Sequence, residues 1–164
     1  MNIKQVLDDI KKKLKKTGGK QPMRLLGNYA LNLIRDRTRK GFGVPHAGGS
    51  KEPLKALSAN YIQWRQKNKR KLSKFAKPSK SNLTRTGRML ESLRVIETKN
   101  FGFTIAPTGQ SKEGVPNEDI ARHHEKGIKT KKGIVKRPFL YLSQEEINQC
   151  IKFYEKEILK NALQ

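Results

Sequence analysis

The residues with the clearest potential for chemistry are His123, His124 and Glu125, which are consecutive in the sequence. Histidine can ligate a metal or carry a proton at neutral pH, and glutamate can act as a general base. Adjacent residues on a helix point about 100° apart, so these imidazoles are poorly placed to share one metal ion. The zinc-peptidase pattern of two histidines four positions apart is missing. A small metal-dependent nuclease using His123 or His124 is therefore only an alternative, and we expect no metal or cofactor.

Other candidates for catalysis are sparse in the sequence. The lone Cys150 cannot form an intrachain disulfide and is interpreted as a half-buried helix residue. The Gly-rich segment 41–50, which contains His46, lacks the Gly-Lys-Ser/Thr ending of a phosphate-binding loop. No nucleophile elbow of the Gly-x-Ser-x-Gly type occurs, and the central carboxylates show no spacing of an acid–base pair. These carboxylates are Glu91, Glu97, Glu113, Glu118, Asp119 and Glu125. We therefore expect a protein that is not an enzyme.

Positive charge is the strongest feature of the sequence. The 164 residues include 37 Lys and Arg against 14 Asp and Glu, a formal net charge of +23. Residues 53–90 contain eleven Lys and Arg and no acidic residue. Such a segment repels itself unless an anion lies nearby, and nucleic-acid phosphate or an acidic protein surface is the usual partner. The residues expected to contact DNA or an acidic partner are Lys67, Lys69, Arg70, Lys71, Lys74, Lys77, Lys80, Lys129, Lys131 and Lys132.

Two aromatic residues, Trp64 and Phe75, lie within this basic segment. Aromatic side chains among positive charges are typical of surfaces that bind single-stranded nucleic acid. Tyr61 shares one side of a predicted helix with Trp64, however, and we interpret Trp64 as a core residue. On charge alone, a non-specific nucleic-acid-binding protein of ribosomal or nucleoid type is a second alternative.

The length and composition predict one domain, residues 1–164, with a modest hydrophobic core. At 34% hydrophobic and 31% charged residues, the chain is expected to carry mobile basic loops. These loops are placed at about 41–56, 72–83, 108–117 and 127–136. No apolar run is long enough to span a bilayer, and the first residues contain no long apolar segment. We therefore expect neither a membrane partner nor a secretory signal.

Hydrophobic periodicity predicts several helices and one β-hairpin. The helices are expected over residues 2–16, 22–39, 58–69, 86–93, 118–126 and 143 to about 162. The strands are expected over residues 94–98 and 101–106, joined at Lys99-Asn100. Ser143 and Glu146 have the spacing of a capping box. This order predicts an α+β fold, in which N- and C-terminal amphipathic helices pack a small antiparallel hairpin-based sheet.

Four short motifs follow one another along the sequence. A Leu57-Ser58 helix entry comes first, and residues 83–93 then give a Leu-x-x-Thr-Gly-x-Leu-x-x-Ser-like signature. After the predicted hairpin, residues 121–127 give an Ala-x-x-His-x-x-Gly-like segment. Arg137-Pro138-Phe139-Leu140 comes last. Over residues 25–158 this arrangement resembles the bacteriophage tail-completion and head–tail joining proteins, the group that includes minor tail protein Z of lambda-like phages. The loops 72–81 and 108–117 are long and the net charge is high for that family.

The resemblance implies a structural virion protein of the phage neck, which joins the head connector to the tail. It implies a homo-oligomeric ring, most simply a hexamer, that contacts the head–tail connector and the tail terminator or tail tube. DNA in the lumen is a further expected contact. Assembly would take place in the host bacterial cytoplasm, and the family offers no catalytic residues to carry over.

Overall fold

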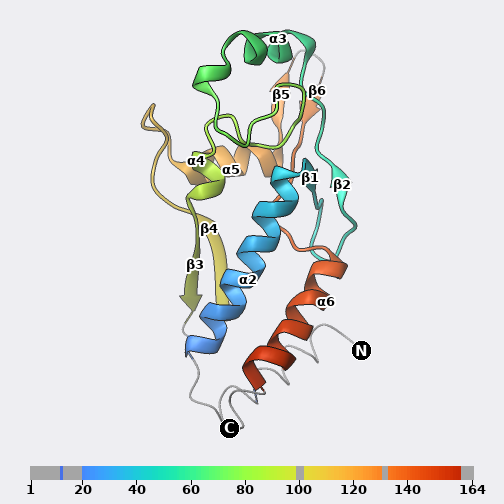
Figure 1. Ribbon diagram of the computed structural model, residues 1–164, viewed down its shortest axis with the longest axis vertical. Helices are drawn as coiled ribbons and strands as arrows, with labels where there is room; N and C mark the ends of the chain where they lie inside the picture. The colour runs from blue at the N-terminus through green and yellow to red at the C-terminus, as the bar shows by residue number, and fades with distance from the viewer. Residues whose placement is uncertain (1–11, 13–19, 99–101, 131–132, 160–164) are drawn as a thin grey trace.

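The computed structural model describes residues 12, 20–98, 102–130 and 133–159 (Figure 1). The predicted helix over residues 2–16 lies outside this part of the chain, apart from Lys12. The helices are α2 (Lys20–Arg39), α3 (Ala59–Lys67), α4 (Arg88–Glu91), α5 (Asn117–Lys126) and α6 (Gln144–Phe153). A 3-10 helix, η1 (Lys69–Lys71), follows α3, and a π-helix, η2 (Tyr154–Leu159), follows α6.

The strands of the described residues form three two-stranded antiparallel sheets, so the predicted α+β class is confirmed. These sheets pair β1 (Phe42–Gly43) with β2 (Glu52–Pro53), β3 (Leu93–Thr98) with β4 (Gly102–Pro107), and β5 (Ile128–Thr130) with β6 (Gly133–Val135). Within these ranges, no helix is both long enough and apolar enough to cross a bilayer.

Helix α2 is the axis of the molecule, and it packs against the β3–β4 hairpin on one side and α6 on another (Figure 1). Its apolar residues recur at helical spacing and supply both hydrophobic clusters. The first cluster contains Met23, Leu26, Ala30, Cys150 and Tyr154. The second contains Leu31, Ile34, Met89, Leu90, Leu93, Ala121 and Phe139. Gly27 lets α2 approach β3 closely, because a Cβ there would lie only 2.5 Å from Cγ1 of Val95.

The predicted hairpin is confirmed, with register running from Leu93 opposite Pro107 to Thr98 opposite Gly102. Side chains alternate along β3, so that Leu93 is fully buried while Arg94 is exposed. Arg35 of α2 ties the hairpin to the helix, because its guanidinium donates to the carbonyls of Leu90 and Leu93. The hairpin is thereby fixed against α2 by both packing and hydrogen bonds.

The predicted capping box at the start of α6 is confirmed. The Ser143 hydroxyl accepts from the Glu146 backbone N–H, and the Glu146 carboxylate accepts from the Ser143 N–H. The same carboxylate pairs with the guanidinium of Arg37 on α2, and the two side chains are 2% and 3% exposed. Arg37 also donates to the carbonyl of Phe139. One buried ion pair therefore joins α2, the start of α6 and the segment that precedes α6.

Two segments that the sequence analysis expected as loops contain short strands. Ile128–Thr130 and Gly133–Val135 pair as β5 and β6, and Gly127 permits this by adopting a φ of +100° after α5. Residues 41–56 contain β1 and β2 and bury Val44 and Leu54. Strands of only two or three residues are too short for hydrophobic periodicity to indicate them, and the Lys, Gly and Pro of these segments favour loops. The mobility of these segments stays a prediction.

Replacing Glu146 by Gln keeps the shape of the side chain but removes the charge that balances Arg37. We expect the free energy of unfolding to fall by about 3 kcal/mol or more, because an uncompensated charge is left buried. Urea unfolding followed by circular dichroism measures the change. Glu145→Gln is the matched control, since Glu145 pairs with Lys51 at the surface and should contribute less than about 1 kcal/mol. Equal decreases in the free energy of unfolding of the two variants would show that the buried ion pair stabilises the protein no more than the surface pair does.

Candidate functional site

The exposed cations of α3, η1 and the loop that follows are gathered at one end of the molecule, and we call this surface the basic end (Figure 1). It contains Lys67, Lys69, Arg70, Lys71, Lys74, Lys77 and Lys80. All seven are exposed, and none belongs to the ion pairs formed among the described residues. The structure therefore brings this part of the predicted set onto one surface without carboxylates to neutralise it.

Helix α3 sets the direction of the first cations of the basic end. It begins after Ser58, whose hydroxyl accepts from the Tyr61 N–H at 3.3 Å, as the sequence predicts for an N-cap. It ends at Asn68, whose side-chain amide donates to the Trp64 carbonyl at 2.9 Å. The chain then tightens into η1, so that three consecutive basic residues are displayed on one short turn.

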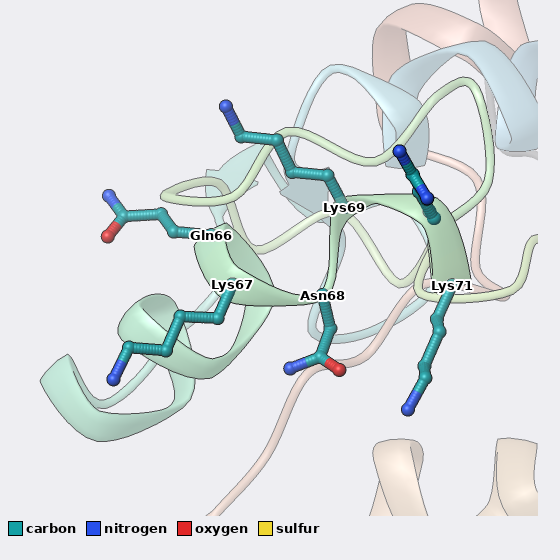
Figure 2. Close-up of a pocket in the computed structure, with 6 residues that line it drawn as sticks. Gln66, Lys67, Asn68, Lys69 and Lys71 are labelled. Carbon is teal, nitrogen blue, oxygen red and sulfur yellow. The ribbon is translucent and has the colours of Figure 1, made fainter.

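A shallow hollow of about 440 Å³ lies along this turn, lined by Gln66, Lys67, Asn68, Lys69, Arg70 and Lys71 (Figure 2). In Figure 2 the side chains of Lys67, Lys69 and Lys71 point outward in different directions and do not converge on one point. A small anion would meet only one of these ammonium groups at a time. The arrangement suits an extended array of negative charges better than a single bound ion.

The loop after η1 is held in place from its inner side. Asn82 is 1% exposed, donates to the Phe75 carbonyl at 2.9 Å and accepts from the Thr84 hydroxyl at 2.6 Å. Ser73 in turn donates to the Thr84 carbonyl at 2.6 Å. The sequence predicts an exposed loop here, whereas the structure buries the C-terminal end of this loop. Short polar side chains that form hydrogen bonds with the loop's own backbone are the sequence signal that could have indicated this burial.

Arg65 is the positive residue that sequence reasoning missed, because it is buried within the most basic stretch of the chain. Its guanidinium donates to the Lys80 carbonyl at 3.0 Å and lies 5.8 Å from the ring centroid of Tyr61. Burial lowers the pKa of this guanidinium, and the remaining nitrogens Nε and Nη2 have no hydrogen-bond partner. Arg65 thus links α3 to Lys80, near the C-terminal end of the loop, from the buried side.

The aromatic side chains of the basic end face the chain's own cations. Trp64 stacks on Tyr61 with ring centroids 5.7 Å apart, and the Arg85 guanidinium lies 5.1 Å from the Trp64 centroid. Phe75 has the guanidinium of Arg39 at 4.1 Å from its centroid and the ammonium of Lys74 at 5.2 Å. The prediction of Trp64 as a core residue was wrong, because it is half-buried and belongs to neither hydrophobic cluster.

Arg137 joins the base of the basic end to the rest of the molecule. Its guanidinium donates to the carbonyls of Lys55 and Ala56 and to the hydroxyl of Ser81, at 3.0 to 3.1 Å. Its backbone N–H donates to the carbonyl of His124 at 2.8 Å. β6 ends two residues before Arg137, so the β5–β6 pair with the exposed Lys129 returns to the same junction. Lys131 and Lys132 lie outside the described residues.

Two of the three candidate catalytic residues, His124 and Glu125, take part in the framework. Glu125 Oε1 accepts from the backbone N–H groups of Phe139 and Leu140, at 2.8 and 3.0 Å. Burial, aided by the positive charges of Arg137 and His123, lowers the pKa of His124 to about 4. His123, in contrast, is exposed. Among the described residues, no group of three or more His, Cys, Asp and Glu lies close enough to hold a metal ion.

Three of the four motifs that carry the family resemblance meet in space. Leu90 from the Thr-Gly signature, Ala121 from the histidine segment and Phe139 from the Arg-Pro-Phe-Leu segment share the second hydrophobic cluster. Gly87 caps α4 with a φ of +78°, which requires the backbone freedom of glycine. Comparisons with protein-family models, characterised proteins and solved structures gave no match for this chain, so the resemblance depends on these motifs alone.

Replacing Asn82 by Ala should loosen the loop of the basic end while the hydrophobic clusters stay intact. The Phe75 carbonyl and the Thr84 hydroxyl would lose their buried partner, and trypsin should then cleave faster after the loop lysines Lys74 and Lys80. Limited trypsin digestion followed by mass spectrometry measures the rate. Asn32→Ala, at an exposed position of α2, is the control and should leave the rate unchanged. Equal cleavage of wild type and the Asn82 variant would show that these hydrogen bonds do not hold the loop.

The low pKa of His124 predicts a pH dependence of stability. The unfolded chain binds a proton near pH 6.5 and the folded chain only near pH 4, so stability should fall as the pH drops between these values. The loss attributable to this group is on the order of 3 kcal/mol. Urea unfolding at a series of pH values measures it. His124→Gln should flatten the profile between pH 7 and pH 5, whereas His123→Gln should not. An unchanged profile in the His124 variant would assign the dependence to other groups.

Proposed function

We propose that this protein is a structural component of a bacteriophage virion, a tail-completion or neck protein that joins the head connector to the tail. The observation that carries the proposal is the ordered set of motifs over residues 25–158. Three of the four motifs pack around a single hydrophobic cluster, which agrees with a shared structural role for them. The motif residues Leu90, Ala121 and Phe139 are all at most 2% exposed.

The roles of the candidate catalytic residues agree with a structural protein. Glu125 is engaged by two backbone N–H groups and therefore serves to position the Arg-Pro-Phe-Leu segment. His124 is largely buried and resists protonation near neutral pH, which suits packing better than proton transfer. We therefore rank a neck protein above the nuclease that would use His123 or His124.

The proposed assembly is a homo-oligomeric ring, most simply a hexamer, placed between the head–tail connector and the tail terminator or tail tube. A small core combined with a net charge of +23 favours a protein that is completed by its partners. In the ring, neighbouring subunits and adjacent neck layers would supply the buried area that the single chain lacks.

Electron microscopy of virions from the phage that encodes this chain tests the proposal most simply. The protein should form a ring at the junction of head and tail, and removal of its gene should leave filled heads and tails that do not join. Absence of the protein from purified virions, or a dispersed position along the tail, would reject the neck assignment. A ribosomal or nucleoid location would favour the second alternative.

A DNA-cleavage assay tests the nuclease alternative separately. We expect supercoiled plasmid to stay intact when the purified protein is incubated with Mg²⁺ or Mn²⁺. His123→Ala is the informative variant, because His123 is exposed and its replacement should not disturb the fold. Metal-dependent cleavage that is lost in this variant would support a nuclease and contradict the structural role.

A further inference from the structure

The basic end has an excess of charge that the fold itself does not require. Its seven cations are exposed and unpaired among the described residues, and residues 53–90 contain no carboxylate. Like charges this close repel one another and lower stability unless an anion neutralises them. The divergent directions of Lys67, Lys69 and Lys71 in Figure 2 distribute the positive charge over a surface and do not form a pocket. The missing partner is therefore a polyanion with repeated charges.

The composition of the basic end favours phosphate over a carboxylate-bearing protein. Six of its seven cations are lysine, which is depleted in the centres of protein–protein interfaces, whereas phosphate backbones are bound readily by such hydrated point charges. Exposed large hydrophobic residues occur elsewhere on the described part of the chain, and none lies between residues 57 and 90. They are Leu25, Phe42, Ile96, Val115, Ile128, Ile134 and Tyr141. The basic end thus presents no fully exposed apolar side chain as an anchor for a protein partner, and its half-buried rings contact the chain's own cations.

The aromatic contacts indicate which part of a nucleic acid is bound. Recognition of single strands depends on aromatic rings that are free to stack on bases. Here Trp64 is engaged by Tyr61 and Arg85, and Phe75 is engaged by Arg39 and Lys74. Stacking on a base would require these cation–π contacts to break. Contact with the sugar–phosphate backbone requires no such change.

Hydrogen bonds beneath the basic end hold its backbone in position before a partner binds. Arg65 bonds to Lys80 from below, Asn82 holds the loop to the Phe75 carbonyl, and Arg137 ties Ser81 to the segment before α3. Positions fixed before binding cost less conformational entropy when the partner arrives. β5, which carries the exposed Lys129, returns through β6 to the same junction and offers a further cation to the contact.

We propose that the basic end binds the phosphate backbone of duplex nucleic acid without reading its base sequence. Duplex is favoured over single strands because it presents one charge per about 1.7 Å of its axis, against one per about 3.4 Å for each strand. This inference goes beyond the neck assignment and does not depend on it, because it follows from the surface of the single chain.

Fluorescence anisotropy with short labelled DNA tests this proposal. The full chain should bind two duplexes of unrelated sequence equally, and should bind the separate strands more weakly. The association constant should fall steeply between about 50 and 200 mM salt, because each neutralised phosphate releases counterions. The triple variant Lys69→Gln, Arg70→Gln, Lys71→Gln should give a log–log salt slope that is shallower by up to roughly 2.7, since each lost contact removes about 0.9.

The matched control removes the same number of positive charges from other surfaces of the molecule. It combines Arg24→Gln, Lys112→Gln and Lys152→Gln, all at exposed positions on α2, the loop before α5, and α6. This variant should keep the wild-type salt slope. Circular dichroism establishes that both variants are folded before binding is compared.

Several results would overturn the proposal. Equal losses in the two triple variants would mean that net charge, and not the basic end, determines binding. Tighter binding to single strands with quenching of Trp64 fluorescence would indicate base stacking. Strong preference for one duplex would indicate base readout, and binding to poly-glutamate with no binding to DNA at low salt would assign the surface to an acidic protein. If the protein binds DNA as expected but is not found at the phage neck, the neck assignment is rejected and the DNA-binding proposal stands.

Discussion

The buried ion pair between Arg37 and Glu146 is the interaction on which the rest of the structure depends. Moving two charges out of water is costly, and the cost is offset only when the remaining polar atoms find partners. Glu146 also accepts from the Ser143 N–H, and Arg37 also donates to the Phe139 carbonyl, which leaves Nε as the one nitrogen of this guanidinium without a partner. Burial lowers the pKa of Arg37 and the Glu146 charge opposes that shift. The pair forms only when α2, α6 and the Phe139 segment are all in place, so it specifies one arrangement of them.

That arrangement extends from the core to the basic end. Arg37 binds the Phe139 carbonyl, and Glu125 binds the N–H groups of Phe139 and Leu140, so this segment is held from two helices. Two residues earlier, Arg137 reaches the segments on both sides of α3. The position of the exposed cations therefore follows from the buried charges. Exposed carboxylates such as Glu52, Glu113 and Glu145 lie on other parts of the described surface, whereas the segment that forms the basic end contains none.

Local patterns in the sequence predicted the local parts of the fold. The Ser143–Glu146 capping box, the β3–β4 hairpin and α2 are each determined by residues within a few positions of one another, and each was found where expected. The Arg37–Glu146 pair spans 109 residues, so no local pattern indicates it. The same limit explains Arg65 and Trp64. Sequence identified the basic stretch, but only packing determines that Arg65 is buried beneath it and that Trp64 stays half-buried against Arg85.

The central claim is that a rigid frame displays the basic end toward nucleic-acid phosphates, and backbone-amide NMR during a titration with duplex DNA tests it most directly. We expect saturable shift changes confined to α3, η1, residues 72–81 and Lys129. The amides of Phe139, Leu140 and Ser143, which belong to the buried network, should keep their positions. Changes centred on α5 around His123, or on α6, would contradict the account. Broad rearrangement of the buried amides would equally show that the frame is not rigid.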